Sequence, residues 1–413
     1  MTAPAPAGGR LVARTTRLDV APEPLAVAGG DGLLFSAPGG EALAGRGEAA
    51  RVRPEDAAAL LGAARVEDPV GRPGTGPVAL GALPFHPDEA GALVVPALVV
   101  GRAPDGTAWV TTVGTEDAPP ADPATLDGAR LRAPDVRGPG PGSFAVESAR
   151  SPSDWCGAVA EATARIRAGG LDKVVLAREV RVTADAPFDL AAVLRRLALG
   201  FPGCHLWSVD GFVGASPELL VGRDGDRVRS QPMAGTAPRR GDPVADADAV
   251  AGLLASPSYR HEHQVTIDAV YDALVPFCSF LDFEAEPSVV ALPNVTHLAT
   301  TVSGVLSSPP ASVLDLVAAL HPTPAVCGRP RAAALAAIAE LEGFARGPYA
   351  GAVGWTDRHG NGTWAVAIRS AVVDGAEARV FGGNGIVADS DPPTELIETR
   401  AKLQAMLSVL VRP

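Results

Sequence analysis

Short runs of β-forming residues, bounded by glycine, proline or aspartate, recur along most of the chain. Between residue 21 and about residue 115 they include GLLFSAP, PVALGALPF, ALVVPALVVG and AWVTTVG. Further along, FVGASPELLVGRDGDRVRSQPMAGT is typical of strands around an R-D-G-D turn, and VGWTDRHGNGTWAVAIRSAVV is typical of a hairpin closed over DRHGNG. Because hairpin turns join antiparallel strands, this pattern predicts large, mostly antiparallel sheets built from turns rather than from helical crossovers.

The second part of the chain also contains helical patterns. Residues 153–170 have apolar residues at helical spacing between Ser153, which can serve as an N-cap, and a Gly-Gly stop. Further helices are expected at residues 259–276, 311–319, 330–343 and 393–411. Together with the hairpins, these helices predict a mixed α+β fold.

The composition divides the chain into three segments within one globular unit. Residues 1–20 are expected to form a flexible lead, residues 21–145 a β-rich subdomain, and residues 146–413 a larger second region. Residues 116–150 are the tract richest in proline, glycine and aspartate, and we interpret them as a loop between the two subdomains.

Charge and hydropathy exclude several classes of partner. A formal net charge of −12, without a block of lysine and arginine, disfavours nucleic acid. The longest apolar stretches are too short to span a membrane, and the first residues lack the apolar core of a secretory signal, so a cytoplasmic location is expected. The cysteines fit neither a zinc site nor a C-x-x-C motif and are expected to be reduced: Cys156, Cys204, Cys278 and Cys327.

Two ionisable residues interrupt apolar strands. Glu218, in FVGASPELLVG, either points out of a half-buried strand or is enclosed, in which case burial favours the protonated acid, a proton donor. Lys173, which opens the run VVLA, is either a strand-edge lysine that opposes aggregation or an amine in a dry pocket that acts as a base.

An acidic residue, Glu262, lies early on the helix expected at residues 259–276. Its simplest role is a favourable interaction with the helix dipole. The adjacent His261 and His263 face different sides of the helix, so a histidine-rich zinc site is not expected.

The last helix follows the sequence GGNG and carries Glu395, Glu398 and Lys402 on one face. Glu398 and Lys402 can form an ordinary i,i+4 surface ion pair. Alternatively, the glycines let backbone N–H groups approach an anion at the helix N-terminus. The carboxylates would repel that anion unless a divalent cation lay between them.

Magnesium resolves this conflict, because it accepts a few carboxylate oxygens, ligand oxygens and retained waters. Glu398, Glu262 and a substrate carboxylate form a chemically coherent set of ligands. Arg369, a charge inside the apolar strand VAIRSAVV, could bind the same substrate carboxylate.

Nine ordered motifs resemble the chorismate-utilising enzymes, the family of isochorismate synthases, salicylate synthases, anthranilate synthase large subunits and aminodeoxychorismate synthases. The resemblance runs from GLLFSAP onward and is strongest between residues 170 and 405. The motifs are DKVVLAREV, GASPELLVG, PMAGTAPR, RHEHQVTIDAV, THLATTVSGVL, HPTPAVCGRP, GPYAGAVGW, WAVAIRSAVV and GGNGIVADSDPPTELIETRAKL.

The resemblance implies a fold like that of the anthranilate synthase large subunit, with antiparallel sheets stacked as a sandwich and helices outside. It implies that residues 146–413 form the chorismate-binding catalytic region, and that the protein is a monomer. It also implies that Lys173 activates water, that Glu218 is the general acid, that Glu262 and Glu398 bind Mg²⁺, and that Glu395 lies in the outer shell of the metal site. The substrate-lining positions are Gly235, Thr236, His297, Ala325, Tyr349, Arg369, Gly383, Gly385 and Lys402.

Two positions depart from the family pattern. Tyr259 replaces a frequent acidic residue three positions before Glu262, and Asn384 replaces the usual alanine between glycines. Within the family, a lysine at position 173 accompanies water as the nucleophile, which disfavours anthranilate synthesis. Ala325 stands where pyruvate-eliminating members carry threonine. Isochorismate synthesis is therefore the main expectation, with salicylate synthesis or a catalytically silent chorismate-binding paralogue as alternatives.

Overall fold

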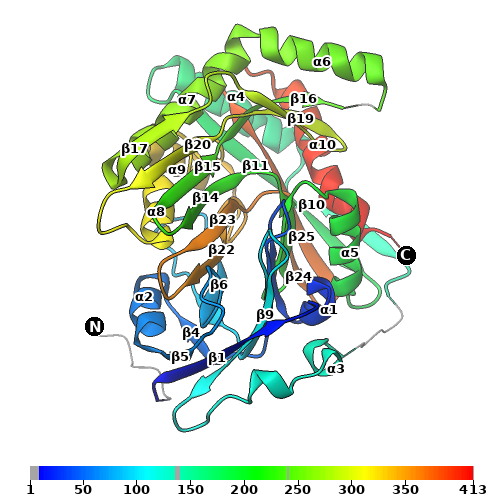
Figure 1. Cartoon of the computed structure of the whole chain (residues 1–413). Coiled ribbons are helices and arrows are strands. Elements are labelled where there is room, and N and C mark those ends of the chain that lie inside the picture. The colour runs from blue at the N-terminus through cyan, green and yellow to red at the C-terminus, as the bar shows by residue number, and fades with distance from the viewer. Residues whose placement is uncertain (1–8, 135–139, 240, 413) are drawn as a thin grey trace.

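The computed structural model describes residues 9–134, 140–239 and 241–412, and its strands form two large sheets and one small sheet (Figure 1). The first sheet contains, in spatial order, β10 (Phe144–Ser148), β11 (Lys173–Ala184), β25 (Glu377–Ile386), β24 (Ser370–Asp374), β13 (Phe212–Ser216), β12 (His205–Val209), β2 (Leu33–Ser36), β3 (Ala42–Arg46), β8 (Leu98–Arg102), β9 (Ala108–Thr115), β1 (Leu11–Leu18) and β5 (Arg65–Glu67). The short β21 (Gly328–Arg329) also pairs with β11.

The second sheet is assembled mainly from hairpins. Its order is β17 (Cys278–Phe283), β20 (Val302–Leu306), β15 (Arg227–Gln231), β14 (Leu219–Asp224), β23 (Gly362–Val366), β22 (Ala352–Asp357), β6 (Val78–Leu83), β7 (Leu93–Val95) and β4 (Ala50–Val52). The small third sheet contains β16 (Met233–Pro238), β19 (Val295–Ala299) and β18 (Ser288–Ala291). The two hairpins predicted from sequence, β14–β15 and β22–β23, are confirmed.

Ten α-helices are found among the described residues. They are α1 (Pro24–Ala28), α2 (Pro54–Ala63), α3 (Gly128–Leu131), α4 (Pro152–Arg167), α5 (Leu190–Gly200), α6 (Pro243–Ala255), α7 (Pro257–Leu274), α8 (Val313–Leu320), α9 (Arg331–Leu341) and α10 (Pro392–Leu410). Each of the five helices expected from sequence is present, with ends shifted by at most a few residues. None of the described helices has the length and apolar character needed to cross a bilayer.

The two large sheets stack face to face. Leu33, Phe35 and Trp207 of the first sheet pack against Leu80 and Val353 of the second in one buried cluster. The other face of the first sheet is covered by α1, α5 and α10, whose apolar residues join a second cluster (Figure 1). The predicted α+β fold of stacked antiparallel sheets with outer helices is confirmed.

The N-terminal segments differ from their prediction in two places. Residues 11–18 of the expected flexible lead form β1, which pairs along its whole length with β9; residues 1–8 lie outside the described residues. The segment read as strands and turns also contains α2, whose signals are a proline at its start and Glu55 and Asp56 in its first turn.

The tract read as a loop, residues 116–150, is partly regular. It contains α3, β10 and a 3₁₀ turn at Pro123–Thr125, while residues 135–139 lie outside the described residues. Both large sheets combine strands from either side of residue 145, so the two sequence segments share one pair of sheets.

Candidate active site

A cavity of about 510 Å³ lies where β11 and β25 meet the small sheet and helices α7 and α10. Every site residue singled out from the sequence lines it. These residues are Lys173, Glu218, Gly235, Thr236, Glu262, His297, Ala325, Tyr349, Arg369, Gly383, Gly385, Glu395, Glu398 and Lys402.

Glu218 lies between β13 and β14 and is only 4 % exposed. Burial raises the pKa of its carboxyl group to about 8, although the Met233 backbone N–H and the positive charges of Lys173 and Arg369 act in the opposite direction. Burial disfavours the carboxylate because the low-dielectric interior solvates charge poorly. At neutral pH this side chain is therefore mostly a neutral acid that can donate a proton into the cavity.

Lys173 is the first residue of β11 and is also buried. Its Nζ donates a hydrogen bond to Oε1 of Glu262 at 2.6 Å, forming an ion pair. Burial alone raises the pKa of Glu262, but the Lys173 charge and hydrogen bond, with Lys402 and His263, bring it below its ordinary value. The role of Lys173 as a base stays a prediction, and the structure adds the contact of its amine with a carboxylate.

The GGNG segment, residues 382–385, forms the end of β25 rather than a turn into the last helix. Its residues pair in antiparallel register with β11, and residues 387–391 separate it from α10. A Cβ atom on Gly385 would lie 2.6 Å from Cε of Lys173, and one on Gly383 would lie 3.1 Å from the Tyr349 hydroxyl. The interpretation as an anion cradle at a helix N-terminus is therefore wrong. These two glycines leave space for side chains that line the cavity.

We expect Gly385→Ala to fold but to displace the Lys173 amine, because the added methyl group overlaps the flexible end of the lysine side chain. A displacement of about 1 Å can reduce turnover by about 100-fold. Thermal unfolding and steady-state kinetics measure the two effects separately. Gly170→Ala is the matched control, since nothing lies within 4 Å of its added Cβ. Equal turnover in both variants contradicts this role for Gly385.

Asn384 connects the acidic and basic residues of α10. Its Oδ1 accepts a hydrogen bond from Lys402 Nζ, and its Nδ2 donates to Glu395 Oε2 at 2.9 Å. The other oxygen of Glu395 accepts a hydrogen bond from the Ser390 hydroxyl at 2.7 Å. Lys402 also forms the i,i+4 ion pair with Glu398, at 2.8 Å. Both oxygens of Glu395 are therefore already engaged, whereas Glu398 is held by one cation.

The acidic side of the cavity can accept a magnesium ion, although the described residues contain no preformed group of three or more metal-binding side chains. Glu262, Glu395 and Glu398 all act on the hydroxyl of Tyr259: burial raises the pKa of Tyr259 most, and these three carboxylates raise it further. All three carboxylates line the same cavity. Mg²⁺ commonly takes one or two protein carboxylates and fills its remaining positions with substrate oxygens and water. Glu262 and Glu398 fit that requirement, while the engaged Glu395 fits an outer position.

Arg369 and His297 form the cationic side of the cavity. Arg369 has a left-handed backbone (φ 53°), and its Nη2 donates to Nε2 of His297 at 2.6 Å. The histidine proton therefore resides on Nδ1, which lies 3.2 Å from the Gly235 carbonyl and from the Thr236 hydroxyl. Burial, followed by the charge of Arg369, holds the pKa of His297 well below its usual range.

Nη1 of Arg369 is buried and has no hydrogen-bond partner among the described residues. Burial lowers the pKa of Arg369 to about 10, which still leaves it charged at neutral pH. An unpaired buried guanidinium N–H is costly unless a ligand satisfies it. The arrangement suits a carboxylate-bearing substrate.

One supporting pair was not found from the sequence. Glu342 and Arg346 form a buried ion pair, and Arg346 donates 2.8 Å hydrogen bonds to the carbonyls of Val175 and Val326, which flank the cavity. Glu342 accepts a hydrogen bond from the Ala177 N–H at 2.7 Å. The only sequence signal was the i,i+4 spacing of two opposite charges.

Comparisons with known proteins identify the family of this chain. A family model described as chorismate binding enzyme matches residues 44–411. The chain belongs to this family. Among curated relatives in the family, the Bacillus subtilis isochorismate synthase MenF is 36% identical over 359 residues, covering 81% of this chain and 75% of the relative. Isochorismate synthase DhbC of the same organism is 40% identical over 279 residues, covering 65% and 70%.

Solved structures share the fold. The menaquinone-specific isochorismate synthase MenF from Escherichia coli superposes with a TM-score of 0.83 at 24% identity, covering 98% of this chain and 96% of that one. Anthranilate synthase component I from Streptococcus pneumoniae gives a TM-score of 0.67 at 20% identity, covering 98% and 93%. The predicted likeness to the anthranilate synthase large subunit is confirmed at the level of fold.

Proposed function

We propose that this protein is an isochorismate synthase, which converts chorismate to isochorismate by adding water at carbon 2 and expelling the hydroxyl group from carbon 4. The observation that carries the proposal is the neutral, buried Glu218 in one cavity with Lys173 and with the unpaired N–H of Arg369. The family match and the names of the relatives support the same reaction.

Lys173 and Glu218 each carry out one of the two proton transfers. Lys173 accepts a proton from the water that attacks carbon 2, while Glu218 donates a proton to the departing hydroxyl on carbon 4. The double bond shifts between these positions, so one water is added, one is lost, and the net proton count is unchanged. Nη1 of Arg369 binds a substrate carboxylate and fixes the ring between the two groups.

Lys173 acts as a base through its unprotonated amine, and its Nζ lies in hydrogen-bonding contact with Glu262. Mg²⁺, held by Glu262, Glu398 and a substrate carboxylate, would screen the negative charge that shifts during the reaction. Glu262 and Glu398 would hold the ion, and Glu262 is also the hydrogen-bond partner of Lys173.

Ala325 favours isomerisation without elimination of pyruvate. It lines the cavity as a small apolar residue that offers no hydroxyl group to the substrate. Salicylate synthesis would use the same acid and base and would also release pyruvate, so the product decides between the two activities.

A monomeric state and a cytoplasmic location stay predictions.

The deciding experiment incubates the purified protein with chorismate and Mg²⁺ and identifies the products by chromatography and mass. We expect isochorismate, no stoichiometric pyruvate in a lactate dehydrogenase-coupled assay, and loss of turnover when EDTA is added. Stoichiometric pyruvate indicates a salicylate synthase instead. Unchanged chorismate with and without Mg²⁺ indicates a binding protein that has lost catalysis.

A further inference from the structure

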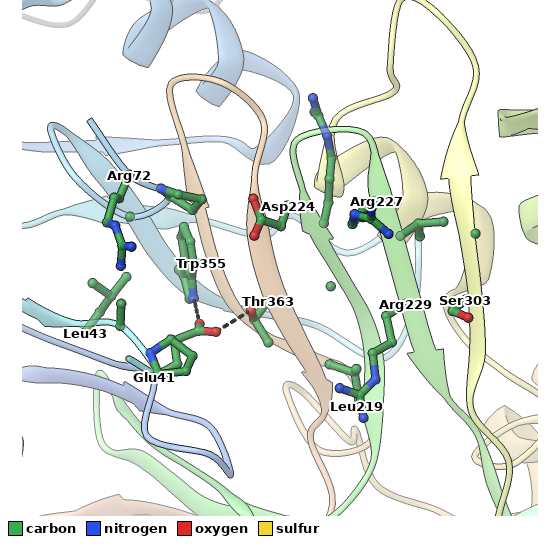
Figure 2. Close-up of a pocket in the computed structure, with 18 of the residues that line it drawn as sticks. Glu41, Leu43, Arg72, Leu219, Asp224, Arg227, Arg229, Ser303, Trp355 and Thr363 are labelled. Atoms are coloured by element: carbon green, nitrogen blue, oxygen red, sulfur yellow. Dashed lines mark hydrogen bonds between the residues drawn. The ribbon is translucent and has the colours of Figure 1, made fainter. Parts of the chain in front are cut away.

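A second cavity of about 690 Å³ opens between the two large sheets, at the level of β3, β14, β15, β22 and β23 (Figure 2). None of its lining residues belongs to the candidate active site. Glu218 lines the active-site cavity, whereas the next residue, Leu219, lines this one. Because successive residues of an extended chain face opposite sides, the segment separates two distinct sites.

Two arginines on the wall of this cavity lack partners. Arg227 and Arg229 are two residues apart on β15 and therefore share a face, and both are drawn at the cavity in Figure 2. Neither has a side-chain hydrogen bond or an ion pair within residues 9–134, 140–239 and 241–412. Ser303, an exposed residue with a hydroxyl group, lies opposite Arg229 in the sheet register and also lines the cavity.

The other arginines of the cavity are already engaged. Arg72 pairs with Asp105 at 2.6 Å, Arg102 donates to the Gly40 carbonyl at 3.0 Å, and Arg223 donates to the Gly360 carbonyl at 3.0 Å. The lining arginines without a hydrogen-bond partner among the described residues are therefore those of β15, where Asp224 of β14 lies opposite Arg227 in the sheet register and also lines the cavity.

Apolar rings and a carboxyl group complete the cavity. Trp355 of β22 and Thr363 of β23 lie in the same sheet as β15, whereas Glu41 and Leu43 lie at β3 of the first sheet. Trp355 Nε1 donates to Glu41 Oε1 at 2.8 Å, and the Thr363 hydroxyl donates to Oε2 at 3.2 Å (Figure 2). Burial raises the pKa of Glu41 and the charge of Asp224 raises it further, while the hydrogen bonds from Trp355 and Thr363 act in the opposite direction. Glu41 has no cationic partner among the described residues.

We propose that this cavity binds a small aromatic carboxylate. The carboxylate pairs with the guanidinium groups of Arg227 and Arg229, which suit planar oxyanions, and the ring lies against Trp355, Leu43 and Leu219. The volume falls within the usual range of small-molecule sites, roughly 300–1,000 Å³. A bare inorganic anion would satisfy the arginines but leave the apolar wall uncovered.

The test measures binding of 2-naphthoate by isothermal titration calorimetry and by quenching of tryptophan fluorescence, since Trp355 and Trp109 line the cavity. Acetate, inorganic phosphate and uncharged 2-naphthamide are the comparison probes. We expect 2-naphthoate to bind at least 10-fold more tightly than each of them. Equal or tighter binding of acetate or phosphate overturns the aromatic part of the proposal, and equal binding of 2-naphthamide overturns the role of the arginines.

Three variants locate the site. The double substitution Arg227→Gln and Arg229→Gln is expected to weaken 2-naphthoate binding at least 10-fold, while the double substitution Arg17→Gln and Arg65→Gln, at exposed strand arginines outside the cavity, leaves binding unchanged. Arg369→Gln, in the candidate active site, should also retain binding. Loss of binding in that variant, with normal thermal unfolding, assigns the ligand to the active site and overturns the proposal.

Catalysis provides an independent readout. The Arg227→Gln and Arg229→Gln protein should unfold at the wild-type temperature and should retain turnover of chorismate, because neither arginine lines the active-site cavity. A folded variant that still binds 2-naphthoate normally overturns the proposal. The binding measurement uses no chorismate, so its outcome and that of the proposed function are decided separately.

Discussion

Lys173→Ala is expected to lower turnover of chorismate by about 10²- to 10⁴-fold, the range that a positioned general base contributes. The alanine variant lacks the amine that pairs with Glu262 at the start of β11. Binding of chorismate should survive, since Arg369 and the metal-binding carboxylates remain. Single-turnover kinetics and equilibrium binding with Mg²⁺ measure the two properties separately.

Lys173→Arg separates the base from the ion pair. Arginine can keep the contact with Glu262 but stays charged at any working pH, so it cannot accept a proton from water. If Lys173 acts as the base, the arginine variant is as inactive as the alanine variant. Recovery of most turnover in Lys173→Arg would show that the residue acts only through its charge, and the proposed mechanism would lose its base.

The sequence was most informative where chemistry depends on residues close together in the chain. The i,i+4 pair of Glu398 and Lys402 followed from helical periodicity, and the structure contains it. The hairpins followed from their turn residues in the same way. By contrast, the ion pair between Lys173 and Glu262 joins β11 to α7. No local pattern encodes such a contact, so the pairing of this lysine with Glu262 was not predicted from the residues.

The GGNG segment also depends on contacts between residues that are distant in the sequence. Its glycines correctly indicated that a Cβ atom is poorly tolerated at Gly383 and Gly385, but local reasoning supplied an anion as the reason. The actual neighbours are Lys173 at Gly385 and Tyr349 at Gly383, both distant in sequence. A glycine in a sequence can indicate that there is no space for a side chain. Which neighbouring atom occupies that space depends on how the strands and helices pack around it.

Glu218→Gln is expected to lower turnover by about 10²- to 10⁴-fold and to remove a pH limit from catalysis. With a pKa of about 8, the wild-type acid loses its proton as the pH rises through 8, and the rate should then fall about tenfold per pH unit. Glutamine has no such proton to lose. The pH–rate profile of the variant should therefore lack the alkaline limb near pH 8, and a limb that persists there assigns the limit to another group.

Glu218→Gln should also change how the stability of the protein depends on pH. The carboxyl group ionises near 4.5 when exposed and near 8 when folded, so between these values the folded state binds more protons and the wild-type protein loses stability as pH rises. The uncharged glutamine escapes this loss. Relative to wild type, its free energy of unfolding should therefore increase by on the order of 3 kcal/mol from pH 5 to pH 8. Denaturant unfolding at both pH values checks this, and a difference that does not change with pH shows that Glu218 is not buried as a neutral acid.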